Sequence, residues 1–133
     1  MNPPSHLIVD GYNVIHALRR FSRLGSLEEK RERLQKAVEL FAQGEGMDWT
    51  ICFDGKKFDL PRMEDPHILF SREEGADALM ERLAYQAEER GELLCVTNDR
   101  TLRNFLFGLG VSTLSVEEFE SRLRQVEERF GFR

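Results

Sequence analysis

Four aspartates stand where the chain leaves a short apolar run or enters a helical segment, and carboxylates in such places can support metal-dependent chemistry. Asp10, Asp54 and Asp99 follow apolar runs, and Asp77 opens a helical segment. Carboxylates gathered together repel one another, so a cluster of them needs protons or cations to neutralise it. Oxygen ligands favour Mg²⁺ or Mn²⁺, which can activate water and stabilise the leaving oxygen during displacement at a phosphate. The four acids therefore predict a site for one or two divalent cations.

Each aspartate also has an ordinary structural interpretation. Asp10 and Asp54 each precede a glycine, and Asp-Gly is a typical turn dipeptide. Asp99 suits the N-cap of a helix, and Asp77 in a first helical turn complements the helix dipole. Any one of these aspartates is explained in this way. Turns and caps together do not require a carboxylate after every strand, so the joint pattern favours the cation site.

Two further polar residues lie at helical spacing from these acids. Asn13, three residues after Asp10, either caps a helix or orients substrate or water with its amide. Glu81 lies four residues after Asp77 and so shares its helical face. A solvated or ion-paired Glu81 and a second carboxylate near the site are both compatible with the sequence, and the first is favoured.

The acids must be positioned by alternating strands and helices. Short apolar runs without alternation are typical of parallel strands covered on both faces, and the segments between them have helical period. The expected strands are 7–9, 50–53, 67–70, 93–97 and 111–114. The expected helices are 14–20, 27–42, 76–90, 101–107 and 116–130. This alternation predicts a single α/β domain, residues 1–133, whose functional groups collect at the carboxyl edge of a doubly wound sheet.

Capping signals support these boundaries. Three Ser-x-x-Glu patterns, beginning at Ser26, Ser71 and Ser115, fit a capping box, although Gly75 conflicts with the middle one. Three glycines follow helical segments as C-terminal caps do, namely Gly44, Gly91 and Gly131. The segment 55–66 is expected to be the longest loop.

Composition excludes several classes of protein. No apolar run approaches the ~20 residues that cross a bilayer, and the first residues lack a signal-peptide pattern, so we expect a cytoplasmic protein. Cys52 and Cys95 fall in expected strands and are interpreted as buried thiols. No dinucleotide or P-loop motif and no serine-hydrolase elbow is present. An aspartyl phosphatase needs a second aspartate where this chain has Tyr12.

Five segments together resemble a known family. They are residues 7–15, 53–55, 68–71, 75–81 and 96–100, and in this order they resemble the NYN domain family in its YacP-like bacterial branch. The resemblance implies a PIN-like three-layer α/β/α fold with a five-stranded parallel sheet of order 3-2-1-4-5. It also implies divalent-metal-dependent RNA cleavage in the cytoplasm, in some cases on messenger RNA at the ribosome.

The resemblance also implies roles for individual residues. Asp10, Asp77 and Asp99 are the principal acids, and Asn13 and Asp54 complete or support the pocket. Arg100 is interpreted as a phosphate contact or as an ordinary surface arginine. Asn98 stands where a serine is common, and its amide can still contact substrate.

RNA contacts are also expected outside the acids. Lys56 and Lys57 follow Asp54 directly, and Tyr12 is suited to stack on an unpaired base, as are His16 and Phe58. The basic residues from Lys30 to Arg33 are interpreted as a solvated helix face. A net charge of −5 argues against coating of nucleic acid by charge alone. The alternative function is an RNA- or ribosome-binding module that cleaves poorly. A monomer and a homodimer are both compatible with the sequence.

Overall fold

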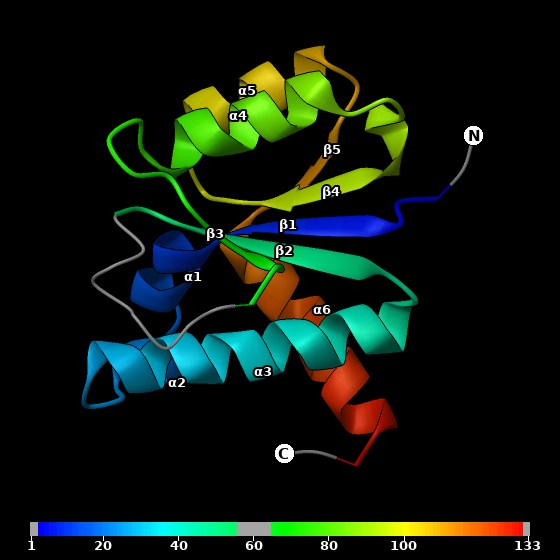
Figure 1. Ribbon diagram of the computed structural model, residues 1–133. Helices are drawn as coiled ribbons and strands as arrows, with labels where there is room; N and C mark the ends of the chain where they lie inside the picture. Colours follow the sequence, from blue (N-terminus) through cyan, green and yellow to red (C-terminus); the bar gives the residue numbers. More distant parts are fainter. Residues whose placement is uncertain (1–2, 56–64, 132–133) are drawn as a thin grey trace.

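The computed structural model describes residues 3–55 and 65–131, which form alternating strands and helices around one sheet (Figure 1). The strands are β1 (His6–Asp10), β2 (Asp48–Phe53), β3 (Ile68–Phe70), β4 (Leu93–Val96) and β5 (Ser112–Leu114). The α-helices are α1 (Gly11–Ala17), α2 (Arg19–Ser22), α3 (Leu27–Glu45), α4 (Ala76–Gln86), α5 (Arg100–Gly108) and α6 (Val116–Arg129). A short 3-10 helix, η2 (Arg90–Glu92), precedes β4.

All five strands are parallel, and their order is β3-β2-β1-β4-β5, as predicted from the sequence. Val9 near the end of β1 is in register with Ile51 on β2 and Val96 on β4. The strand order reverses at β1, because β2 and β3 lie on one side of it and β4 and β5 on the other. The space beyond the carboxyl ends of β1 and β4 is therefore the switch point where ligands bind in such sheets. Asp10 is the last residue of β1 and lies at that point.

Helices cover both faces of the sheet, which gives three layers (Figure 1). Leu7 and Val9 point into a core shared with α1, α3 and α6, whereas Ile8 points into a second core shared with α4 and α5. Both cores are apolar, because a central parallel strand has no solvated face. This explains why the apolar runs in the sequence show no alternation, and it fixes β1 as a rigid support for Asp10.

The capping signals were correct at two of the three serines. Ser26 accepts a hydrogen bond from the Glu29 backbone, and Ser115 forms a full capping box with Glu118. The expected box at Ser71 is wrong, since α4 begins at Ala76 after Gly75, whose φ of 88° breaks the helical path. The local Ser-x-x-Glu pattern does not register this break.

Several expected helix boundaries are also corrected. The first helix, expected over 14–20, is two short helices, α1 and α2. Gly44 lies inside α3, where Val126 packs against it, and the left-handed cap is Gly46 with a φ of 67°. The helix expected over 76–90 ends at Gln86, so Gly91 belongs to η2 and caps no α-helix. Within the described ranges no helix has the length and apolarity to cross a membrane.

Candidate active site

Three acids from separate elements lie at the carboxyl edge of the sheet. Asp10 ends β1, Asp99 is the N-cap of α5 just after β4, and Asp77 lies in the first turn of α4. The charges of Asp77 and Asp99 both act on the Asp10 carboxyl group and raise its pKa. Two of the three other acids that the sequence places at this edge thus act on Asp10 through their charge.

The Asp10 carboxyl group has a strongly raised pKa. Burial is the largest cause and, together with the charges of Asp77 and Asp99, raises the pKa of Asp10 to about 6. The Thr97 hydroxyl and the backbone N–H of Asn13 act in the opposite direction. A buried carboxyl group beside like charges is stable only when a proton or a cation compensates it. The site is thus suited to bind a cation.

Thr97 connects two of the acids, and sequence reasoning did not place it at the site. Its hydroxyl donates to Oδ2 of Asp10 over 2.9 Å and accepts a hydrogen bond of 3.1 Å from the backbone N–H of Asp99. The side chain is fully buried. The only sequence signal was a β-branched polar residue at the end of a buried strand, directly before Asn98 and Asp99.

Asn13, in the first turn of α1, and Asn98, in the loop after β4, connect these two segments. Oδ1 of Asn13 accepts a hydrogen bond of 2.8 Å from the backbone N–H of Asn98. The Asn98 side chain in turn accepts from the Val116 backbone over 2.7 Å and donates to Glu117 over 3.2 Å. Asn98 is therefore held at the start of α6, while Asn13 uses its oxygen to fix the loop that carries Asp99.

Among the residues described, Asp99 and Asp77 keep carboxylate oxygens without a hydrogen-bond partner, although both lie at helix starts. Oδ1 of Asp99 accepts the Leu102 backbone N–H over 3.0 Å, which confirms the N-cap and leaves Oδ2 available. The Asp77 carboxylate lies beside Gly75, where a β-carbon would stand 3.0 Å from Oδ1. A glycine at 75 thus leaves the Asp77 carboxylate room.

Asp54 lies at the end of β2 and has a different partner. Ser71, which is buried, donates from Oγ to Oδ1 of Asp54 over 3.1 Å. Gly55 and Arg72 pair as an isolated antiparallel bridge beside this contact, and Arg72 has a φ of 61°. Asp54 is not among the charges that act on Asp10. Asp54 thus has a partner of its own in Ser71, and this role of Ser71 was not predicted from the sequence.

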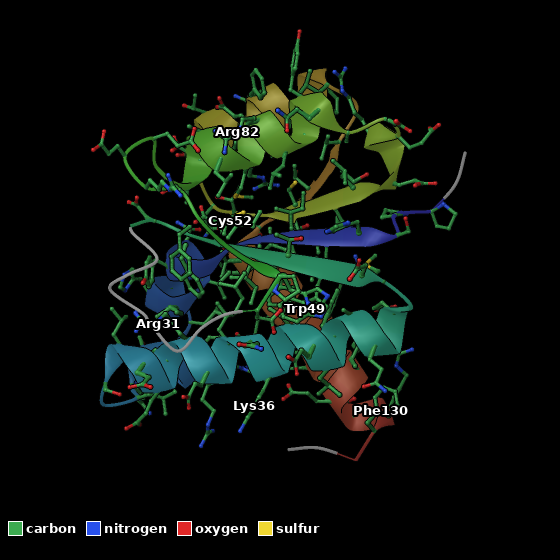
Figure 2. All side chains as sticks on the ribbon, in the orientation of Figure 1. Arg31, Lys36, Trp49, Cys52, Arg82 and Phe130 are labelled. Carbon is green, nitrogen blue, oxygen red and sulfur yellow. The ribbon has the colours of Figure 1, made fainter. Side chains whose placement is uncertain are left out.

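Tyr12 packs inward at the base of the site. Its ring lies 4.9 Å from Phe53 and 6.1 Å from His16, measured between centroids. Its hydroxyl accepts a hydrogen bond of 3.1 Å from Arg31, which Figure 2 shows between α3 and the sheet. Arg31 is only 5% exposed, so its expected place on a solvated helix face is wrong. It contacts Tyr12 across the fold, and no local pattern reports such burial.

The thiols that the sequence placed in strands are free and buried. Cys52 and Cys95 both belong to the core shared with α4 and α5, and Figure 2 shows Cys52 on that side of the sheet. Burial raises the pKa of both thiols, for Cys95 to about 12. They are therefore protonated and serve as small apolar side chains beneath the acids.

The donor set fits a hard divalent cation in charge and chemistry. Among the residues described, none of the four aspartates forms an ion pair with a basic side chain. In residues 3–55 and 65–131, however, no group of three or more acidic, histidine or cysteine side chains has an arrangement that could hold a metal. The acids are close enough to act on the pKa of Asp10, but they are not arranged as a closed ligand shell. Carboxylate oxygens are the donors that hard divalent cations take in proteins.

The remaining expected substrate contacts have different outcomes. Arg100 lies in the first turn of α5, one residue after Asp99, and is exposed. Lys56, Lys57 and Phe58 fall outside the described residues. A groove of about 1380 Å³ between α2, α3 and α6 contains none of the four aspartates. Arg20 in that groove is neutralised by Glu120 and Glu127, so it does not compete with the acidic edge as the site of chemistry.

Residues 7–131 match the YacP-like NYN domain. The chain belongs to the YacP-like NYN domain family. The family resemblance stated from five short segments is thereby confirmed over almost the whole chain. A search among curated proteins gives no match.

Two solved structures are similar to this YacP-like NYN domain. The crystal structure of a mutant of Rae1 (YacP) from Bacillus subtilis superposes with a TM-score of 0.81 at 26% identity. The match covers 96% of this chain and 79% of that chain. The Rae1 (YacP) structure without that mutation gives a TM-score of 0.79 at 25% identity, covering 98% and 78%. The fold of this YacP-like NYN domain is a PIN-like nuclease fold, which supports a ribonuclease-type function in general.

Proposed function

We propose that this YacP-like NYN domain is a divalent-metal-dependent ribonuclease that cleaves RNA internally. The observation that carries the proposal is the convergence of Asp10, Asp77 and Asp99 without basic partners at the switch point of a PIN-like sheet. The Asp10 pKa of about 6, raised by partial burial and by two neighbouring like charges, supports a functional role for this carboxyl group.

Asp10, Asp77 and Asp99 would hold Mg²⁺ or Mn²⁺, with Asp54 as a supporting acid on one side. The bound ion would polarise the phosphate and activate water, which is the chemistry that such cations supply at phosphodiesters. Thr97 holds the Asp10 carboxylate in orientation through its hydroxyl. Asn13 has its oxygen engaged by the Asn98 backbone, so its amide N–H₂ is the part that can reach substrate.

RNA is the proposed substrate, with Arg100, Asn98, Tyr12, Lys56 and Lys57 as candidate contacts. Arg100 is the best placed of the described ones, because it is exposed and next to Asp99. Association with messenger RNA on the ribosome and a cytoplasmic setting are parts of the same proposal. Tyr12 is half-buried and hydrogen-bonded to Arg31, so it contributes by supporting the start of α1 more than by stacking.

The test is cleavage of single-stranded and structured RNAs by the purified chain with Mg²⁺, with Mn²⁺ and with chelator. We expect cleavage that chelator abolishes and that Asp77→Asn reduces by at least about a hundredfold, as loss of a metal ligand does at such sites. Glu88→Gln, an exposed carboxylate beyond the end of α4, is the matched control and retains activity. Metal-independent cleavage, or equal activity of both variants, would contradict the proposal. RNA binding without cleavage would indicate a binding module of the same fold.

A further inference from the structure

A row of side chains on α5 begins beside Asp99 and lines a cleft of about 410 Å³. The residues that line this cleft are Asn98, Arg100, Arg103, Asn104, Phe107 and Thr113. Four of the six recur at positions 100, 103, 104 and 107, which is the spacing of one helical face. At 1.5 Å per residue the row is about 10 Å long, roughly the length of three stacked nucleotides. The residues on either side of Asp99 thus line one end of the cleft, although Asp99 itself does not.

The charge of this cleft is opposite to that of the whole chain. Helix α5 contains two arginines and no acidic residue, in a chain whose net charge is −5. Within the part of the chain that the structure describes, the Arg100 side chain has no ion pair or hydrogen bond. Arg103 has Glu118 at 3.7 Å, a distance at which a partly solvated pair contributes little. Arg100 can therefore bind anionic oxygens directly, and Arg103 can do so by exchanging its weak contact with Glu118.

Phe107 stands at the outer end of the row with its ring in solvent. It is 81% exposed, whereas Leu102 and Leu106 on the opposite face of the same helix are buried. An aromatic ring held on a rigid helix beside guanidinium groups is the combination that proteins use to stack unpaired bases while they bind the backbone. Asn98 and Thr113 add hydrogen-bonding groups from the loop after β4 and from β5.

We propose that this cleft binds unpaired nucleotides of an RNA strand next to the phosphate at the acids. Phe107 stacks on a base, and Arg100 and Arg103 contact the phosphates that lead back to Asp99. The inference rests on the proposed ribonuclease function and extends it by naming where the flanking strand lies. The cleft favours RNA over a protein partner, because it offers two cations and a single ring in place of a continuous apolar face.

The experiment measures binding and cleavage separately. Binding is followed in chelator with short unstructured oligoribonucleotides that carry 2-aminopurine at successive positions, whose fluorescence falls when the base stacks. Phe107→Ala should weaken binding by roughly fivefold or more and abolish quenching at one position, since stacking on a base typically contributes that much. Phe107→Tyr should restore both. Phe105→Ala is the matched control, because Phe105 is partly exposed on the same helix but does not line the cleft.

The two arginines are tested by salt dependence. Arg100→Gln and Arg103→Gln should each lower the slope of log affinity against log salt by about one, while Arg129→Gln at the end of α6 should leave it unchanged. Equal RNA affinity and quenching for Phe107→Ala and Phe105→Ala would overturn the inference, even if the wild type cleaves RNA. Loss of self-association in Phe107→Ala with unchanged RNA binding would assign the cleft to a second copy and also overturn it. Position-specific binding without any cleavage would support the cleft while the ribonuclease proposal fails.

Discussion

The hydroxyl of Thr97 donates a 2.9 Å hydrogen bond to Oδ2 of Asp10, between residues that lie 87 positions apart in sequence. The same oxygen accepts the backbone N–H of Asp99. One buried hydroxyl therefore orients the Asp10 carboxylate and also holds the backbone of Asp99. It also favours the ionised form of Asp10, which burial and the neighbouring acids disfavour.

Thr97→Val should uncouple the two acids while keeping the shape of a fully buried side chain. The pKa of Asp10 should rise further above 6, because a hydrogen bond that lowers it is lost. We expect about 1–2 kcal/mol lower stability, since two polar groups lose their partner, and about tenfold lower cleavage. The pKa is measured by NMR titration of the Asp10 carboxyl carbon, and stability by urea unfolding.

Thr97→Ser is the control for the loss of the hydroxyl, because it retains the donor and removes only a methyl group. It should keep the Asp10 pKa and most of the activity. An unchanged Asp10 pKa in Thr97→Val would show that the hydroxyl does not act on the carboxylate.

Asp10→Asn should change how stability depends on pH when no metal is bound. The Asp10 pKa is about 6 in the folded chain against an ordinary value of 3.8, so the folded state binds the proton more tightly than the unfolded state. The contribution of Asp10 to wild-type stability is therefore fully present below about pH 3.8. It is lost as the pH rises through about 6. Asparagine has no such loss. In chelator the variant should gain about 1–3 kcal/mol relative to wild type between about pH 4 and pH 8.

The measurement is denaturant unfolding of both proteins across that pH range. Added Mn²⁺ should stabilise the wild type more than Asp10→Asn at about pH 8, because a ligand that binds only the folded state raises its stability. A stability difference that stays flat across the whole range would contradict the raised pKa of Asp10.

The sheet and the convergence of three acids were accessible from the sequence for a physical reason. Strands buried on both faces need continuous apolar residues, and the carboxyl ends of parallel strands meet at one edge. Asp10 and Asp99 could therefore be placed at that edge from their positions alone. The strand order and the preference for RNA came from the family resemblance, because periodicity does not specify which strands are neighbours.

The contacts between distant residues were not accessible. Ser71 matched a local capping pattern, yet its hydroxyl bonds to Asp54 at the end of the neighbouring strand. Arg31 has acidic neighbours in sequence that predicted a solvated face, yet it is buried against Tyr12. In both cases a partner far along the chain decides the side chain's place, and a single sequence does not report that partner.

Gly11→Ala should disturb the turn that presents Asp10. A β-carbon at position 11 would lie 2.4 Å from the ring of Phe53, which is fully buried and has no space to move. We expect a loss of about 1–3 kcal/mol in stability, the usual cost of overpacking a core. Gly25→Ala is the matched control, since a β-carbon at position 25 would have no atom within 4 Å. Thermal unfolding compares the two, and Phe53→Leu in the Gly11→Ala background should recover part of the loss.

Asn13→Asp should separate the structural role of Asn13 from a role in substrate binding. An aspartate keeps the oxygen that accepts the 2.8 Å hydrogen bond from the Asn98 backbone, so the loop after β4 stays in place. It removes the N–H₂ donor and adds a negative charge beside Asp10, which should raise the Asp10 pKa further. We expect thermal stability close to wild type but at least about tenfold lower kcat/KM at every pH, because the lost donor is not restored by ionisation.

Asn13→Ala gives the complementary result, since it removes both the oxygen and the donor. It should lower stability by about 1 kcal/mol through the unpaired Asn98 backbone N–H, together with a comparable loss of cleavage. Wild-type kcat/KM for Asn13→Asp at about pH 8, where Asp10 is ionised, would restrict Asn13 to holding the loop. If both variants lose kcat/KM at that pH and only Asn13→Ala is destabilised, the Asn13 amide contacts the substrate. Asn13→Asp keeps the oxygen, so the lost activity then belongs to the N–H₂ donor.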